Sequence, residues 1–329
     1  MFEINDSTKF NEAIKPLPNE VKNLLIQTPT KIKNTAFEIR LRANRSIMLT
    51  CPNQIFSLQK NLNAKIINDC FLAICNYSIH SHINEIKQGF ITLAGGHRAG
   101  LCATAVYNEA GKLTNLKQIS SINIRIARQI KNASIEIFEE LNNNIGKLLI
   151  IGPPSSGKTT ILKDIARKLS LNNIVSIVDT RGEIAACFNA VAQNDVANAD
   201  IFNFWNRSDG ILAAIKTMGP EYIICDEVGN ETDLKAIKEC VGSGVKLIAT
   251  AHGENLEEIR KRPIINQMLE TGAFEHMAIL TNKNTPCKLK YIIKVSDFFE
   301  NSWNINFSNL PNHFWNKPFN EFKVKSKSN

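Results

Sequence analysis

The sequence has no apolar run close to the roughly 20 residues needed to cross a bilayer, and it has no internal repeat. Its eight cysteines lie singly, without the C-x-x-C pair that indicates a zinc site or a redox couple. Its basic residues form no compact run, although the net charge is +8. These absences argue against a helical membrane protein and leave specific nucleic-acid binding without support.

The composition is that of a globular protein, because 43% of the residues are hydrophobic. A length of 329 residues favours two domains, or one large domain with appendages. The N-terminal segment carries acids and asparagines where a secretory signal has basic residues before an apolar block. We therefore expect a cytoplasmic protein whose membrane association, if any, is peripheral and depends on partners. Several cysteines lie in apolar runs and are expected to be buried, reduced thiols.

The first part of the chain predicts an α+β domain over residues 1–140. The stretch FEIRLRANRSIMLTC (37–51) predicts a strand pair, and a helical stretch follows Asn61. The stretch GFITLAGGHRAGLCATAVY predicts two strands joined at the Gly95–Gly96 pair by a turn that needs positive φ. Three asparagines and a glycine in EELNNNIGK (139–147) interrupt the apolar pattern and indicate the domain boundary.

The second part predicts an α/β domain over residues 141–297. The short apolar runs LLIIG, NIVSIVD, YIICDEVG and KLIATAHG alternate with helical patterns, which is typical of parallel strands buried on both faces. Beyond these runs the chain is aromatic and asparagine-rich. We expect this tail, residues 298–329, to pack its aromatic side chains on the body and to fray at its end.

The segment GPPSSGKTT fits the phosphate-loop pattern G-x-x-x-x-G-K-[ST], with a strand before it and an amphipathic helix after it. Its backbone N–H groups are predicted to hold the α- and β-phosphates of ATP. Lys158 is expected to face solvent in the empty loop and to reach the β- and γ-phosphates, and the Thr159 hydroxyl to bind Mg²⁺. The alternative is a glycine-rich turn that matches by chance. The predicted nucleotide-binding residues are Gly152, Pro153, Pro154, Ser155, Ser156, Gly157, Lys158, Thr159 and Thr160.

Two acids at the end of the run YIIC complete this hypothesis. Mg²⁺ held by one hydroxyl and a nucleotide still needs a protein carboxylate, which Asp226 would supply. Glu227 would orient or deprotonate the attacking water. The alternative is that both acids only cap the following helix.

Other polar residues follow neighbouring strand-like runs and are expected to face the same crevice. Glu183 is a second candidate for positioning a metal or the water, in a segment that also carries Asp179 and Arg181. His252, after Thr250, is a candidate for hydrogen bonding to the γ-phosphate, although an isolated histidine after a strand is commonly a turn residue.

Taken in order, seven stretches resemble the stage III sporulation protein AA family, ATPases related to the type II and type IV secretion motors. The resemblance covers about residues 35–295. It implies a RecA-like P-loop ATPase core with a smaller N-terminal α+β domain, assembled as a homo-oligomer, a hexamer, beneath membrane channel proteins of a sporulation secretion complex. The stretches are FEIRLRANRSIML, GFITLAGGHRAGLCATAV, SINIRIARQI, GPPSSGKTTILKDIARKLS, IVDTRGEIAACF, MGPEYIICDEVG and LIATAHG.

The sequence departs from this family where arginines are usual, because Asn198 and Lys216 stand in their place. An arginine near the γ-phosphate stabilises the charge that develops during phosphoryl transfer. We therefore predict that Arg98 or Arg125 approaches the nucleotide of its own or of a neighbouring subunit. The alternative is that Arg125 and Arg128 pair with acids on a solvated strand.

The sequence thus predicts a Mg²⁺-dependent ATPase that powers or assembles a channel complex during spore formation. One alternative is a P-loop ATPase linked to nucleic acid, but about 34 residues follow Val295, too few for an ordinary binding domain. Another is a scaffold that binds nucleotide without hydrolysing it, against which the presence of Glu227 argues.

Overall fold

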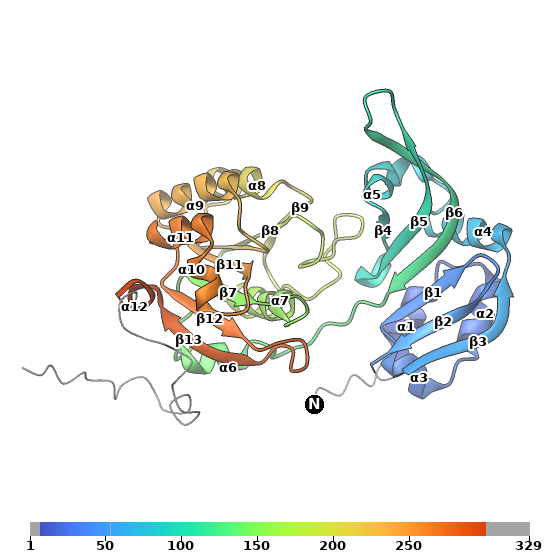
Figure 1. The fold of residues 1–329 in the computed structure, drawn as a ribbon, viewed down its shortest axis with the longest axis horizontal. Helices are drawn as coiled ribbons and strands as arrows, with labels where there is room; N and C mark the ends of the chain where they lie inside the picture. Colours follow the sequence, from blue (N-terminus) through green and yellow to red (C-terminus); the bar gives the residue numbers. More distant parts are fainter. Residues whose placement is uncertain (1–6, 53, 301–329) are drawn as a thin grey trace, which may run out of the picture. The chain divides into compact units, whose positions relative to one another are not determined.

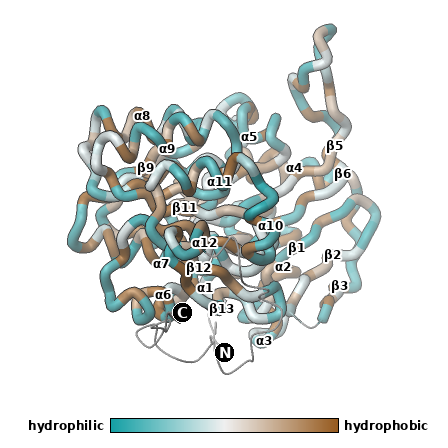
Figure 2. The backbone as a smooth tube through the Cα atoms, turned by 60° about the vertical axis from the view of Figure 1, so that its left-hand side comes forward, coloured by the Kyte–Doolittle hydropathy of each residue, from teal (hydrophilic) through white to brown (hydrophobic). Residues whose placement is uncertain are grey.

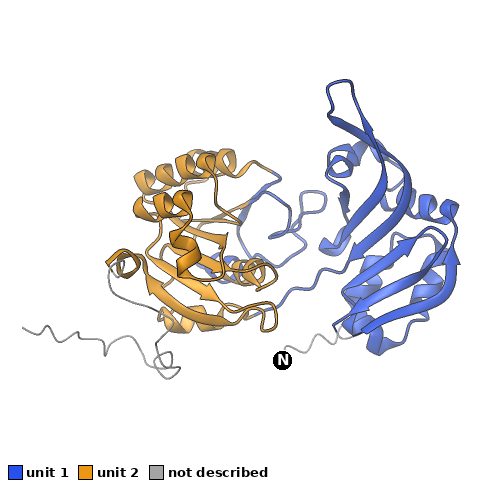
Figure 3. Ribbon diagram, in the orientation of Figure 1, with its two compact units in different colours: residues 1–131, 166–172, 179–204 blue, residues 132–165, 173–178, 205–329 orange. Residues whose placement is uncertain are grey.

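The computed structural model describes residues 7–52 and 54–300 (Figure 1). Spatial contacts divide the chain into two compact units, which are coloured separately in Figure 3. Unit 1 comprises residues 1–131, 166–172 and 179–204, and unit 2 comprises residues 132–165, 173–178 and 205–329. These units follow contacts rather than chain order, so the predicted domain limits stay a prediction. The tail was predicted over residues 298–329 to pack its aromatic side chains on the body. Residues 301–329 of this tail lie outside the described part of the chain.

Unit 1 contains a six-stranded antiparallel sheet in the order β3-β2-β1-β6-β5-β4. The strand pair predicted over 37–51 is confirmed as β1 and β2. The predicted turn at Gly95 and Gly96 is confirmed as well, with φ values of 82° and 78°. The strands are β1 (Glu38–Arg42), β2 (Arg45–Cys51), β3 (Gln54–Leu62), β4 (Phe90–Thr92), β5 (Arg98–Tyr107) and β6 (Leu113–Arg125).

One face of this sheet carries the apolar core of unit 1. Alternate residues of a strand point to the same face of the sheet. On the apolar face Ile39 of β1 is paired with Leu49 of β2 and Ile124 of β6, and all three side chains are fully buried. Apolar residues of α1, α2 and α4 join the same cluster. The helices are α1 (Ser7–Ile14), α2 (Asn19–Ile26), α3 (Thr30–Thr35), α4 (Ala64–Ile74) and α5 (Ile83–Lys87), with two short 3-10 turns, η1 (Ile79–His82) and η2 (Ala94–Gly96).

The opposite face of the sheet is charged around Glu38. Its carboxylate accepts hydrogen bonds from Arg40 at 2.6 Å and from Asn123 at 3.2 Å, and Arg125 lies 3.5 Å away. Burial raises the pKa of Glu38, but these hydrogen bonds and the two arginine charges hold it below its usual range overall. The sheet therefore has one apolar face and one polar face, as expected for antiparallel strands.

The second sheet has seven strands in the order β13-β12-β7-β11-β10-β8-β9. Strands β8, β10, β11, β7 and β12 pair in parallel, and β13 is antiparallel to β12. Every residue of β7, β8 and β10 is buried, which confirms the prediction of parallel strands covered on both faces. The strands are β7 (Leu148–Gly152), β8 (Val175–Asp179), β9 (Asp200–Asn203), β10 (Tyr222–Cys225), β11 (Lys246–His252), β12 (His276–Leu280) and β13 (Leu289–Lys294).

Helices accompany these strands in the alternating order of an α/β fold. The residues Ile161, Leu162, Ile165, Ala166 and Leu169 share the buried face of α7, as the sequence predicts. In Figure 2 the apolar segments gather along the strands, and the outer helical turns are more hydrophilic. The helices are α6 (Ile135–Glu140), α7 (Lys158–Leu169), α8 (Arg207–Thr217), α9 (Glu231–Ser243), α10 (Leu256–Arg260), α11 (Pro263–Glu270) and α12 (Val295–Glu300).

All eight cysteines are free thiols. Six are buried, as predicted, whereas Cys102 is exposed on β5 and Cys287 is half-buried.

The helices within residues 7–52 and 54–300 are too short or too polar to span a membrane.

A buried histidine joins the Gly95–Gly96 turn to the chain that leaves β6. The Nδ1 atom of His97 accepts a hydrogen bond from the Ala127 N–H at 3.0 Å, and the side chain is fully buried. Burial and the positive charges of Lys9 and Arg128 lower the pKa of His97 to about 4, although Glu12 opposes the shift. The imidazole is therefore neutral at pH 7 and its Nδ1 is available as an acceptor.

We expect this histidine to make unit 1 sensitive to acid. Its folded pKa lies below the unfolded value of about 6.5, so its contribution to stability is present above about pH 6.5 and is lost as the pH falls toward 4. The loss amounts to about 2 kcal/mol at pH 5. His97→Asn keeps an acceptor near the Nδ1 position but does not titrate, so its urea midpoint should fall less between pH 7 and pH 5 than that of the parent. Equal decreases in the two proteins would contradict this role.

Candidate nucleotide-binding site

The phosphate loop joins β7 to α7 and is closely packed at both of its key glycines. A Cβ atom at Gly152 would collide with the Ser156 hydroxyl, and one at Gly157 would lie 2.6 Å from the Cys287 backbone nitrogen. Gly157 also has a φ of 92°, which L-residues rarely adopt. The loop therefore follows a path that these two glycines permit.

The loop has the features of an anion-binding cradle. The first N–H groups of a helix have no partner within the helix, and they carry the positive end of its dipole. Lys158, Thr159 and Thr160 form this first turn of α7. The Ser156 hydroxyl is fully buried and has no hydrogen-bond partner among the described residues. Such a buried orphan group is consistent with a site that binds a polar ligand.

Lys158 is folded into the loop, so the expectation that it faces solvent is wrong. Its side chain is only 6% exposed, and its Nζ donates to the carbonyl oxygens of Gly152 at 2.7 Å and Pro153 at 2.9 Å. These carbonyl oxygens replace the water that a solvent-facing ammonium group would bind. Burial lowers the pKa of Lys158, and the negative charge of Glu227 only partly opposes the shift.

The structure brings three of the predicted site residues into one hydrogen-bonded chain. The Lys158 Nζ lies 3.3 Å from Nδ1 of His252, whose Nε2 lies 3.1 Å from Oε1 of Glu227. An ammonium group can only donate, so Nδ1 is the acceptor and Nε2 carries the imidazole proton toward the carboxylate. His252 thus connects the phosphate-loop lysine to the candidate water-positioning acid.

The backbone after β10 is fixed by Thr250 of the neighbouring strand β11. The Glu227 N–H donates to the Thr250 hydroxyl at 2.8 Å, and the Val228 N–H donates to the Thr250 carbonyl at 2.9 Å. Glu227 has a left-handed backbone, with a φ of 47°, which is unfavourable for a residue with a side chain. Such a conformation persists where surrounding contacts impose it and is common at functional sites.

A buried ion pair supports Asp226 and the turn that follows it. Arg207 at the start of α8 donates to Asp233 at 2.8 Å, with side chains only 11% and 2% exposed. Asp233 also accepts hydrogen bonds from the Gly229 and Asn230 backbones. Burial lowers the pKa of Arg207, and the neighbouring charges, Asp233 and Asp226 among them, raise it above its usual range overall.

Sequence reasoning missed this pair. The spacing Asn230-x-x-Asp233 was a usable signal for Asp233, because the two residues form a reciprocal capping box at the start of α9. Nothing local in the sequence links Arg207 to it, because 26 positions separate the two side chains.

Arg98, Arg125 and Glu183 belong to unit 1, where each has an ion-pair partner. Arg98 lies 3.1 Å from Glu183 and its guanidinium carbon is 3.4 Å from the centroid of the Phe90 ring. Arg125 faces Arg98 across β5 and β6 and lies 3.5 Å from Glu38. The expected roles of Arg98, Arg125 and Glu183 at a nucleotide stay predictions.

Asp179 of the predicted crevice and Arg128 both have backbone partners in unit 1. Both carboxylate oxygens of Asp179 accept backbone hydrogen bonds at 2.8 Å, from Glu183 and Ala185. Arg128 donates to the carbonyl oxygens of Lys33 and Ala36. Asp179 therefore shapes the segment that carries Glu183, and Arg128 contacts the α3 region.

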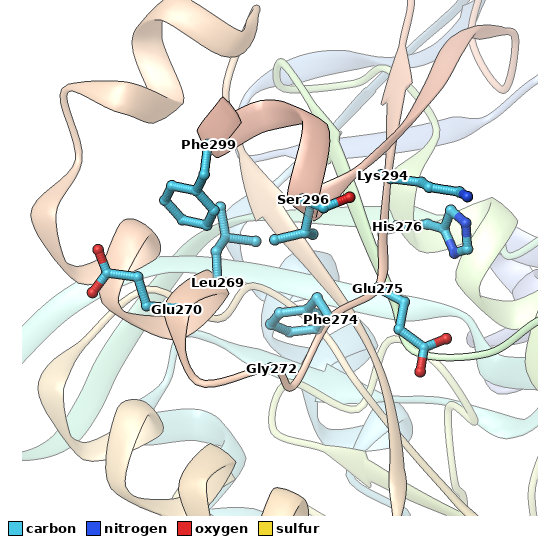
Figure 4. A pocket seen from close by; sticks show the side chains of 10 residues that line it. Leu269, Glu270, Gly272, Phe274, Glu275, His276, Lys294, Ser296 and Phe299 are labelled. Carbon is cyan, nitrogen blue, oxygen red and sulfur yellow. The ribbon is translucent and has the colours of Figure 1, made fainter. Parts of the chain in front are cut away.

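Figure 4 shows a separate hollow in unit 2. Its residues include Phe274, His276 and Lys294. His276 is paired with Leu148 at the beginning of β7, whereas the phosphate loop follows the end of β7. The hollow is therefore not part of the candidate nucleotide site.

The fold and this site define a RecA-like α/β protein with a phosphate loop. The structure matches that of the pilus retraction motor PilT with bound ADP, with a TM-score of 0.56, 13% identity, and coverage of 86% of this chain and 85% of that chain. It also matches the Legionella pneumophila ATPase DotB, with a TM-score of 0.52, 18% identity, and coverage of 80% and 76%. The predicted fold class, an α/β RecA-like core of the P-loop type with a smaller N-terminal α+β domain, is confirmed.

The chain belongs to the family described as sporulation stage III, protein AA, whose profile matches residues 7–296. It is 34% identical over 284 residues to the stage III sporulation protein AA of Bacillus subtilis (strain 168). That alignment covers 84% of this chain and 92% of the relative. The predicted family is thereby confirmed.

The Arg207–Asp233 pair should be important for the stability of unit 2. Arg207→Gln would leave the Asp233 charge buried without its partner and should lower the free energy of unfolding by about 3 kcal/mol. The matched control is Glu275→Gln, which breaks a longer, 3.9 Å pair with Lys147 at a side chain that is 55% exposed. This control should change stability by about 0.5 kcal/mol or less. Similar urea midpoints for the two variants would contradict the assignment.

Proposed function

We propose that this protein is a Mg²⁺-dependent ATPase of the secretion-motor type. The observation that carries the proposal is the chain from Lys158 through His252 to Glu227 beside a glycine-constrained phosphate loop. In ATP hydrolysis a lysine binds the β- and γ-phosphates and a side chain orients the attacking water. Lys158 and Glu227 are suited to these two roles.

The residues present fit a nucleotide and a magnesium ion. The first turn of α7 and the buried Ser156 hydroxyl supply donors for phosphate oxygens. Thr159 offers a hydroxyl and Asp226 a carboxylate, the oxygen ligands that Mg²⁺ prefers. Magnesium bound there would neutralise charge on the phosphates. The other residues of the loop, from Gly152 to Thr160, would form the walls of the cradle.

In this proposal Lys158 exchanges partners when nucleotide binds. Its bonds to the Gly152 and Pro153 carbonyl oxygens would be replaced by charge-assisted bonds to phosphate, which are shorter and stronger. His252 would then hold Glu227 in place through its Nε2 proton while Nδ1 becomes available to a new donor. Glu227 would accept or orient the proton of the attacking water.

A positive charge at the γ-phosphate is the remaining requirement. We propose Arg98 or Arg125 for this role, from the same or a neighbouring subunit, with Glu183 as an alternative carboxylate. In support, burial lowers the pKa of Arg98, Glu183 opposes the shift, and the charges of Arg125 and Arg181 add to it, so three guanidinium groups lie near one another in unit 1. Such a concentration of positive charge attracts anions.

Membership of the sporulation family supports a role in spore formation. We further propose that the protein forms a homo-oligomer, a hexamer, that acts on membrane channel proteins, as the resemblance to the sporulation family implies, and the fold that it shares with a pilus retraction motor is compatible with this role. Peripheral attachment at the inner face of a membrane through those partners is part of the same proposal. The strongest competing function is a scaffold that binds nucleotide without turnover, and phosphate release measured on the purified oligomer separates the two.

Lys158→Ala should weaken ATP binding by roughly 10- to 100-fold, because it removes a charge-assisted contact to phosphate. Binding can be measured by titration with a fluorescent ATP analogue. Lys238→Ala, at an exposed position of α9, is the matched control and should bind like the parent. A folded Lys158→Ala protein with parental affinity would reject the phosphate-loop assignment.

Glu227→Gln should bind ATP but release phosphate roughly 10²-fold more slowly, because the amide keeps the shape of the side chain and loses its basicity. Glu239→Gln, an exposed change on α9, controls for the loss of one negative charge. Phosphate release at the parental rate would instead favour Glu183 as the acting carboxylate.

A further inference from the structure

The loop between β12 and β13, residues 281–288, is held together by its own hydrogen bonds. The Thr281 N–H donates to the Lys288 carbonyl at 3.0 Å, and the Thr281 hydroxyl donates to the Thr285 carbonyl at 2.6 Å. A further bond joins the Thr285 N–H to the Asn282 carbonyl at 3.2 Å. The β12–β13 loop is therefore a braced turn at the end of an antiparallel strand pair.

Cys287 of this loop lies directly against the phosphate loop. Its backbone N–H donates to the Ser156 carbonyl at 2.8 Å, and its Sγ lies 3.9 Å from the Gly157 carbonyl oxygen. The absent side chain of Gly157 makes room for it, because a Cβ there would lie 2.5 Å from Sγ. Cys287 has a left-handed φ of 64°, so its own backbone is constrained at the contact.

The thiol itself is not activated. Burial raises the pKa of Cys287, and its hydrogen bond with the Thr160 side chain only partly offsets this. A neutral thiol is a weak nucleophile at pH 7. The contact is therefore one of packing and hydrogen bonding.

We propose that Cys287 is a positioning residue that sets the orientation of the phosphate-loop peptide between Ser156 and Gly157. In a planar trans peptide the C=O and the following N–H point in opposite directions. The Cys287 N–H holds the Ser156 carbonyl on the side of the β12–β13 loop. The Gly157 N–H of the same peptide therefore points away from that loop, toward the cradle that the proposed function assigns to phosphate. This inference rests on that proposed function for the identity of the ligand.

The contact of Cys287 with the phosphate loop would make nucleotide affinity depend on the position of the β12–β13 loop at the edge of the sheet. Strand β12 pairs with β7, which delivers the phosphate loop, and β13 is the edge strand beyond it. A displacement of the β12–β13 loop would rotate the Ser156–Gly157 peptide without moving Glu227 or His252. Its effect should thus be on binding, with the chemical step left unchanged.

Cys287→Val tests this coupling, because a β-branched side chain is strained at positive φ and is larger against Gly157. Without nucleotide, backbone amides in residues 155–160 should exchange with deuterium several times faster than in the parent. With nucleotide, the KM for ATP should rise about tenfold while kcat stays within about twofold, the pattern of lost uniform binding. Cys287→Ser should show the exchange rates and the KM of the parent, because a hydroxyl can keep the contact with Thr160.

Cys102→Val, at the exposed cysteine of β5, is the matched control and should change neither measurement. Unchanged exchange in Cys287→Val would overturn the proposal, as would a loss of kcat at constant KM. The exchange measurement needs no nucleotide, so a parent that fails to bind ATP would contradict the proposed function without affecting this result.

A second measurement covers the case in which Cys287→Val does not fold. In a Cys102→Ser background, methyl methanethiosulfonate would convert the half-buried Cys287 thiol to a methyl disulfide and release methanesulfinate. The modified protein should show the same faster exchange at residues 155–160. Modification that leaves this exchange unchanged would overturn the proposal.

Discussion

The parallel pairing of β7 with β11 is the constraint on which the site depends. Its register places His252 opposite Gly152 and Thr250 opposite Ile150, so that two polar residues of β11 flank the start of the phosphate loop. Because side chains alternate along a strand, a shift of one residue would turn both to the other face of the sheet. Thr250 could then no longer hold the Glu227 backbone, and His252 could no longer meet Lys158.

The local part of this arrangement could be predicted from the sequence. The phosphate-loop spacing, the short apolar runs of the buried strands and the acids after β10 each depend on a few adjacent residues, and local patterns reveal such features. The outward orientation expected for Lys158 was wrong because its partners are carbonyl oxygens of a folded loop, whose positions no residue pattern specifies. The roles of Arg207 and Cys287 depend on pairings across 26 and 130 positions, which a single sequence does not reveal.

The two units use charged residues in different ways. In unit 2 the buried charges of Arg207 and Asp233 neutralise each other and leave little freedom to either side chain. In unit 1 the pair between Arg98 and Glu183 is about one-third exposed on both sides. An exposed pair contributes little to stability and can be broken at little cost. The fixed Arg207–Asp233 pair thus supports the turn after β10, whereas the Arg98–Glu183 pair can be broken at little cost.

The left-handed backbone of Glu227 bears on any selection of more stable variants of this protein. Glycine would relieve a strain of about 1 kcal/mol at this position, and asparagine part of it, so selection for stability alone would remove the glutamate. Under the proposed function, this strain is the cost in stability of holding a carboxylate beside the phosphate loop, a trade-off between stability and activity. A search for thermostable variants of this chain would therefore tend to find substitutions here that make the fold more stable while they remove the carboxylate from the site.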